Sequence, residues 1–140
     1  MGYCSIEDVV HEFTPDLKAC MLRDYSDAFE QNILGHIEKA HDFVNASLAR
    51  AYSVPLKQAA SVVISAECKI AAYFSTIAYS EKDDVVKDKY ETAITMLDNL
   101  VLADNPALVD EGLTDAEIVA SGVLYGSDDI IFPADELDKW

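Results

Sequence analysis

Basic residues are scarce in this sequence, and their scarcity disfavours two classes of partner. The 140 residues include 10 Lys or Arg against 26 Asp or Glu, so the formal net charge is -16. Affinity for nucleic acid comes largely from cations that displace counterions from phosphates, so this balance disfavours a protein that grips DNA. The same argument disfavours adhesion to an anionic membrane surface.

Cysteine, glycine and suitably spaced histidines are also too few for the common catalytic or metal sites. The three cysteines, Cys4, Cys20 and Cys68, form no Cys-x-x-Cys pair, and their odd number does not suit a disulfide framework. The five glycines form no phosphate-binding loop, and no Gly-x-Ser-x-Gly turn occurs. His36 and His41 are five positions apart, whereas a spacing of four lets two imidazoles on a helix face one ion. We therefore expect no cofactor, no metal ion and no enzymatic activity.

The sequence also offers little evidence for export or for a membrane span. Its first residues contain no basic stretch followed by an apolar run, so we expect no secretory signal and a cytosolic, reducing environment. Residues 59–79 are apolar nearly throughout and long enough to suggest a span. Glu67 and Lys69 stand at their centre, however, where a charge in a bilayer costs at least ~2.5 kcal/mol. These charges favour a buried core helix instead.

Apolar residues at helical spacing are abundant. The hydrophobic fraction of 51% excludes wholesale disorder. Ser5, with Asp8 three positions later, predicts a capped helix to about residue 13, and Pro15 predicts the start of a second, short helix. A long amphipathic helix is predicted from about residue 27 to 51. Its apolar stripe recurs at steps of three and four and consists of Ile33, Ile37, Ala40, Val44, Leu48 and Ala51.

Two further helices follow a break at residues 52–56, which we call the elbow. Pro55 disfavours helical geometry at the preceding residue, so the elbow is expected to run extended. The core helix is predicted from about residue 56 to 79, and Ser80 is expected to cap a further long helix that ends near residue 101. The sequence therefore predicts an all-α fold, a small bundle of about four main helices within residues 1–101.

Residues 102–140 are predicted to form an extended acidic carboxy-terminal arm. They hold ten acids and one base, yet they end on a cluster of apolar side chains with no periodic partner, the terminal peptide (residues 130–140). Apolar anchors ringed by charge suit a protein interface, so we expect the elbow and the terminal peptide to dock on partners. The candidate interface residues are Tyr52, Val54, Pro55, Leu56, Ile130, Ile131, Phe132, Leu137 and Trp140. The alternative is that the terminal peptide folds back onto its own bundle.

Taken in order, these features resemble the Mu-type phage head-tail adaptor family. The similarity rests on a short amino-terminal IEDVVHEF, a long helix ending in LARAYSVPL, an apolar helix with AECKIAAYF, a helix with VVKDKYETAITMLDNL and a terminal IIFPADELDKW. The most specific positions are Tyr52, Pro55, Leu56, Lys89, Tyr90, Phe132 and Leu137.

The resemblance implies a head-completion connector located in the neck of the virion and made in the cytoplasm of the bacterial host. Its expected partners are further copies of itself in a ring, twelve-fold to match a portal, the portal protein, and a tail-completion or neck protein. DNA is expected to pass through the acidic ring without being gripped, and no membrane is involved. The rival from a different class is a cytosolic acidic helical regulator, or a DNA mimic, that binds a basic protein.

Overall fold

The structure, a computed structural model, describes residues 2–79, 83–114 and 116. Helices account for all of the regular elements in this part of the chain, where the only β pairing is an isolated bridge between Ala59 and Asp110. The prediction of an all-α fold is confirmed. In chain order the elements are α1 (Ile6–Val10), α2 (Pro15–Tyr25), η1 (Ser26–Ala28), α3 (Phe29–Leu48), α4 (Ser61–Ala78), α5 (Asp84–Ala103) and η2 (Pro106–Leu108).

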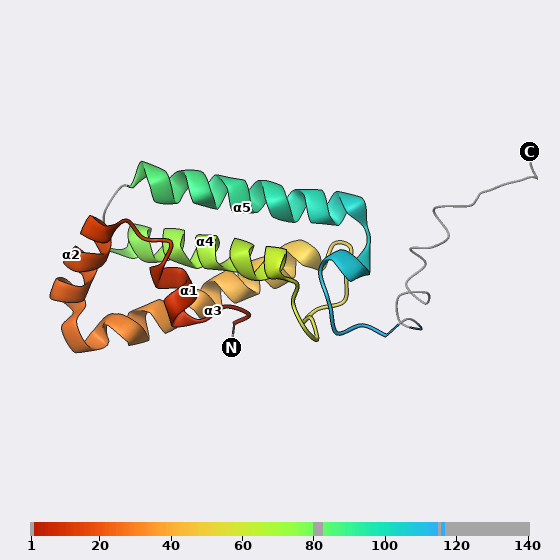
Figure 1. Cartoon of the computed structure of the whole chain (residues 1–140), viewed down its shortest axis with the longest axis horizontal. Helices are drawn as coiled ribbons and strands as arrows, with labels where there is room; N and C mark the ends of the chain where they lie inside the picture. The colour runs from red at the N-terminus through yellow and green to blue at the C-terminus, as the bar shows by residue number, and fades with distance from the viewer. Residues whose placement is uncertain (1, 80–82, 115, 117–140) are drawn as a thin grey trace, which may run out of the picture.

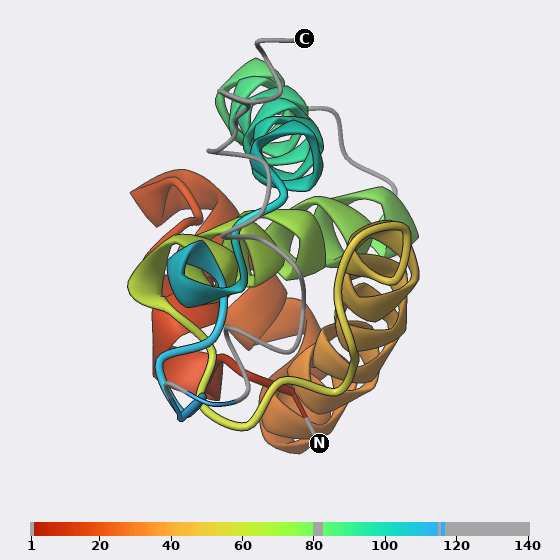
Figure 2. The same ribbon diagram turned by 90° about the vertical axis from the view of Figure 1, so that its right-hand side faces the viewer.

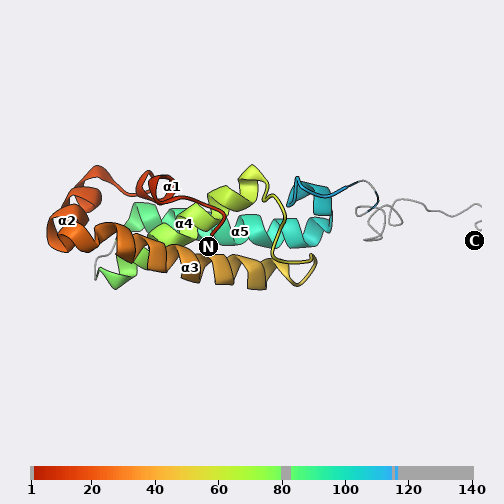
Figure 3. The same cartoon turned by 90° about the horizontal axis from the view of Figure 1, so that it is seen from below.

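The apolar helix α4 forms the middle of the bundle. It packs against α3 on one side and α5 on the other, and α1 contacts it as well (Figures 1 and 2). The short helix α2 lies at one end of the long helices, whereas η2 lies at the other (Figure 3). By length and composition alone α4 is apolar enough to cross a membrane, but half of it is buried inside this bundle. Its packing is that of the core helix predicted from the sequence.

Side-chain caps explain where several helices begin. Ser5 and Asp8 form the predicted capping box at the start of α1, and Thr14 caps α2 ahead of Pro15. Asp83 caps α5, because its carboxylate accepts hydrogen bonds from the first backbone N–H groups of that helix. The predicted cap at Ser80 lies outside the described residues.

The helix α4 begins five residues later than predicted, at Ser61. The backbone N–H groups of Leu56, Lys57 and Gln58 donate to the side chains of Tyr3 and Asp110, and these bonds hold the segment in an irregular path ahead of the helix. The elbow and the residues up to Ala60 therefore form an irregular connection that crosses the end of the bundle (Figure 1).

The folded body extends beyond residue 101, where the sequence predicted the arm to start. The helix α5 continues to Ala103, and the chain then turns back, with Asp104 at a positive φ of 49°. Val109 is only 1% exposed, and its carbonyl oxygen accepts a hydrogen bond of 2.9 Å from the N–H of Ala60. Residues 104–114, which we call the strap, therefore belong to the body, and the terminal peptide lies outside the described residues.

Candidate functional site

The elbow is partly interior, which revises the role expected for two of its residues. Tyr52 and Leu56 are 9% and 7% exposed, so their side chains hold the elbow to the body instead of standing free as anchors for a partner. Val54 is half-buried against the core, and Pro55 is exposed. The candidate surface at the elbow thus narrows to Val54, Pro55 and the hollow next to them.

Tyr52 ties the elbow to the end of α5. Its hydroxyl donates a hydrogen bond to the carbonyl oxygen of Leu100 and accepts one of 3.1 Å from the backbone N–H of Asn105. Burial raises the pKa of Tyr52 above its ordinary value, although the hydrogen bond from Asn105 opposes this. The phenol therefore stays neutral at physiological pH and serves as a fixed polar link between the elbow and the strap.

Asp110 ties the strap to the chain that follows the elbow. Its carboxylate accepts hydrogen bonds from the backbone N–H groups of Lys57 (2.8 Å), Gln58 (2.9 Å) and Gly112 (2.9 Å). Burial by itself would raise the pKa of Asp110, but these donors outweigh it and lower the pKa below the ordinary value. The charged form of the Asp110 carboxylate therefore holds the strap to the residues that follow the elbow.

A third polar link joins the elbow to the amino terminus and to α3. The phenol oxygen of Tyr3 accepts a hydrogen bond of 2.8 Å from the backbone N–H of Leu56. The same hydroxyl donates to the Oδ1 atom of Asn45, on α3, at 2.6 Å. The pKa of Tyr3 is raised, mainly by burial. The position of the elbow therefore depends on a residue more than fifty positions earlier in the chain.

This polar chain continues inward to a fully buried carboxylate, that of Glu67 on α4. Because the Oδ1 atom of Asn45 is used by Tyr3, its amide nitrogen donates to the Nε2 atom of His41 at 3.2 Å. The ring proton of His41 is then on Nδ1, which lies 3.0 Å from one Glu67 oxygen. The other Glu67 oxygen accepts a hydrogen bond of 3.0 Å from the backbone N–H of Cys4. The presence of Glu67 within an apolar helix was visible in the sequence, but the sequence does not show that its partners are His41 and Cys4.

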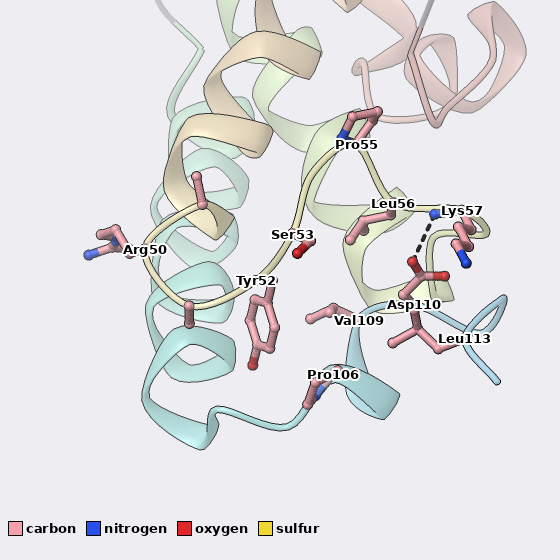
Figure 4. Close-up of a pocket in the computed structure, with 12 residues that line it drawn as sticks. Arg50, Tyr52, Ser53, Pro55, Leu56, Lys57, Pro106, Val109, Asp110 and Leu113 are labelled. Carbon is pink, nitrogen blue, oxygen red and sulfur yellow. Dashed lines mark hydrogen bonds between the residues drawn. The ribbon is translucent and has the colours of Figure 1, made fainter. Parts of the chain in front are cut away.

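A pocket lies between the elbow and the strap, and we call it the elbow pocket. It has a volume of about 610 Å³, and its walls are formed by residues 49–53, residues 55–57, Pro106, Val109, Asp110 and Leu113. The side chains of Tyr52, Leu56, Val109 and Pro106 surround the same hollow (Figure 4). Pockets that take small ligands or side chains typically measure roughly 300–1,000 Å³, and the elbow pocket falls within that range, with both apolar and polar residues in its wall.

Exposed apolar side chains lie at the same end of the body. Leu102, in the last turn of α5, is 82% exposed, and Leu108, in η2, is 45% exposed. Arg50, beside the elbow pocket, has its guanidinium 2.9 Å from the Asp98 carboxylate in a solvent-exposed ion pair. Leu102 and Leu108 therefore add apolar surface near the pocket, and their exposure was not anticipated from the sequence.

Two kinds of reactive group could carry chemistry, a metal cluster and a free thiol. The described residues contain no group of three or more His, Cys, Asp or Glu side chains that could hold a metal ion. The thiol of Cys4 is buried; its hydrogen bond with Cys68, together with burial, raises the pKa of Cys4. A thiol in that state is a poor nucleophile.

Comparison with known protein families identifies the family of the chain. The model of the family described as bacteriophage Mu, Gp36 matches residues 3–118. The chain belongs to this family. Membership makes it a phage-type protein, and it implies a virion-associated protein that is made in the host. No curated protein and no solved structure matches the chain.

The match covers the whole described body and ends before the terminal peptide. It includes the elbow, where Tyr52 and Leu56 act as internal links, and the Lys89–Tyr90 pair that the sequence singled out. Lys89 holds α5 to the turn between α1 and α2 through an ion pair of 3.2 Å with Glu12, and the Tyr90 ring stacks on the Tyr73 ring of α4. These positions are therefore structural in the subunit. Phe132 and Leu137 lie beyond the matched span.

Proposed function

We propose that the chain is a structural protein of the virion neck: a head-tail connector that forms a ring under the portal, completes the filled head and joins it to the tail. The observation that carries the proposal is membership of the bacteriophage Mu Gp36 family over residues 3–118. The proposed partners are neighbouring copies, the portal protein and a tail-completion or neck protein. The proposal requires no catalysis and no cofactor.

The arrangement of apolar surface supports a ring. A closed ring uses head-to-tail contacts, in which one patch of each subunit meets a different patch of the next. The chain carries two different apolar patches. One is the end of the body with the elbow pocket, Leu102 and Leu108, and the other is the terminal peptide. Val54 and Pro55 lie at the first patch, so the elbow keeps its proposed place in the interface.

The net charge of -16 supports the passage of DNA. A wall that carries negative charge repels phosphates, so the genome moves past it without adhering. The charge also keeps free subunits apart until specific contacts hold them together. The same charge is expected of a DNA mimic, but a mimic requires a basic protein partner and no ring.

Deleting residues 127–140 tests the proposal. The deletion removes no residue of the described body, so the helical circular dichroism signal should show that the body still folds. The truncated chain should fail to co-purify with portal-bearing heads, whereas the full chain should co-purify and should appear as a ring in electron micrographs of the neck.

Two results would overturn the connector proposal. One is a full chain that never associates with heads or tails, and the other is a chain that instead binds a basic host protein with a steep loss of affinity in salt. If the truncated chain still completes heads, the connector role stands, but its anchor is not the terminal peptide. The surface around Pro55 would then be tested next.

A further inference from the structure

We propose that the elbow pocket is the binding site for residues 130–137 of the same chain in the free subunit. The proposal rests on the pocket, on the point where the chain leaves it, and on the charges around it. It does not depend on the connector role. In the connector, the same peptide would have to leave this pocket before it docked elsewhere.

The pocket suits a short apolar peptide. Its side chains come from two segments that other bonds already hold in place, since Tyr52 and Asp110 fix the elbow and the strap to each other. The pocket is therefore formed in advance, and a ligand does not have to order it. Ile130, Ile131 and Phe132 form the longest apolar run of the terminal peptide, and Pro133 ends it. Aromatic residues such as Phe are enriched in the buried cores of protein interfaces.

The chain leaves the body at the pocket itself. Leu113 lines the pocket, and residue 116 is the last described position. The 13 residues from 117 to 129 can span at most about 43–47 Å when fully extended. That length is more than enough to turn back to a hollow next to its own starting point. A tether of this kind gives an effective local concentration on the order of millimolar, far above that of a second copy in dilute solution. This difference favours the chain's own peptide over a neighbour's.

Charge at the pocket complements charge around the peptide. Two of the three charged residues in the pocket wall, Arg50 and Lys57, are basic; the third, Asp110, has its carboxylate bonded to three backbone N–H groups. The apolar run is preceded by Asp128 and Asp129 and is followed by further acids. The Arg50–Asp98 ion pair is about half exposed on both sides, and a pair of that kind is weak enough to be exchanged for another carboxylate.

Photo-crosslinking of the full chain tests the proposal. Phe132 is replaced by a photoreactive benzoylphenylalanine, and the crosslinked product is analysed by mass and by peptide mapping. We expect crosslinks to pocket residues such as Leu56, Val109 or Leu113, in a product of monomer mass. Their yield should not change when the protein is diluted a hundredfold, because the contact is intramolecular.

A substitution that fills the pocket adds a matched comparison. Ala51→Phe introduces a large side chain into the pocket wall and should reduce the crosslinking yield at least tenfold. Ala19→Phe makes the same change on exposed α2, at the other end of the body, and should leave the yield unchanged (Figure 1). Circular dichroism of both variants confirms that they are folded. If Ala51→Phe does not fold, the mapped crosslinks of the unsubstituted pocket decide the question alone.

Three outcomes would overturn the proposal. Crosslinks at dimer mass whose yield rises with concentration would show that the pocket takes the peptide of a second copy. Crosslinks that map to another face of the body would place the peptide elsewhere. Absence of any crosslink to the body would show that the pocket does not hold the peptide. None of these results bears on whether the chain enters particles, so the connector proposal is tested separately.

Discussion

The middle of the bundle and its elbow end are held together by different forces. In the middle, α3, α4 and α5 bury apolar side chains such as Ala40, Val44 and Ile70, which are 0% exposed. At the elbow end, the chain is fixed by a few polar atoms that accept hydrogen bonds from backbone N–H groups, chiefly those of Tyr52 and Asp110. Apolar burial has no direction and tolerates small shifts, whereas a hydrogen bond requires a defined distance and angle.

This difference suggests that the middle of the bundle provides stability and that the elbow end provides a binding surface. The middle supplies most of the stability, because burial of large apolar side chains is the main favourable term in folding. The elbow end is held in a fixed shape by hydrogen bonds, so some of its apolar side chains can remain exposed. A binding surface needs that combination, since a partner must find both apolar area and a defined geometry. Four substitutions test the division, from the largest expected effect to the smallest.

Leu48→Ala should have the largest effect, because it opens a cavity in the apolar core, where Leu48, the last residue of α3, is 0% exposed. We expect the free energy of unfolding to fall by ~2–5 kcal/mol in a urea titration. The matched control is Leu102→Ala, which truncates an exposed leucine and should change stability by less than about 0.5 kcal/mol. A loss below about 0.5 kcal/mol for Leu48→Ala would mean that the stripe on α3 does not form the core.

Glu67→Gln tests the polar chain that connects the two regions. The new amide group places an N–H donor against either the His41 Nδ1–H or the Cys4 N–H, so one buried donor loses its acceptor. We expect a loss of ~1–3 kcal/mol in the same titration. Faster hydrogen exchange at the Cys4 amide would locate the defect. Glu38→Gln, on the exposed face of α3, is the control and should be close to neutral; an equal loss in both variants would contradict the role of Glu67.

Asp110→Asn tests the strap, and it has a pH signature. Because folding lowers the pKa of Asp110 below its ordinary 3.8, the carboxylate stabilises the fold above that pH, and this contribution is lost as the pH falls through the folded-state pKa. The variant should lose about 1–2 kcal/mol at neutral pH and should show a flatter decline of stability in acid. Glu111→Gln, at the exposed neighbouring position, should keep the parent's acid profile. An unchanged profile for Asp110→Asn would contradict the prediction.

Tyr52→Phe should have the smallest effect of the four. It removes one hydroxyl that bonds Leu100 and Asn105 but keeps the buried ring, so we expect a loss of ~0.5–1.5 kcal/mol. The control is Tyr73→Phe, because the Tyr73 ring is held by stacking on Tyr90 at a centroid distance of 4.0 Å. A larger loss for Tyr73→Phe than for Tyr52→Phe would mean that the phenol of Tyr52 does not hold the elbow.

Only part of the candidate site could be predicted from the sequence. The elbow was identified because Pro55 interrupts a helical pattern, and the structure places it at a pocket. Tyr52 and Leu56 were assigned to a partner surface because they are large and apolar, but they turn inward to meet Leu100 and Tyr3. The strap was taken for the beginning of the acidic arm because its composition is acidic. Composition does not reveal that Asp110 is paired with three backbone N–H groups.

The sequence by itself determined the helices and the core. The three-four spacing of Ile33 to Leu48, the cap at Ser5 and the helix start at Pro15 act within a few residues, so they can be recognised in one segment. Only the tertiary structure decided which donor meets which acceptor. Glu67 lies 26 residues from His41 and 63 from Cys4, and Asp110 lies 53 residues from Lys57. Such pairs form because the packing of the helices brings residues that are far apart in the sequence close together in space. A pattern within one short segment cannot show which distant residue will be the partner.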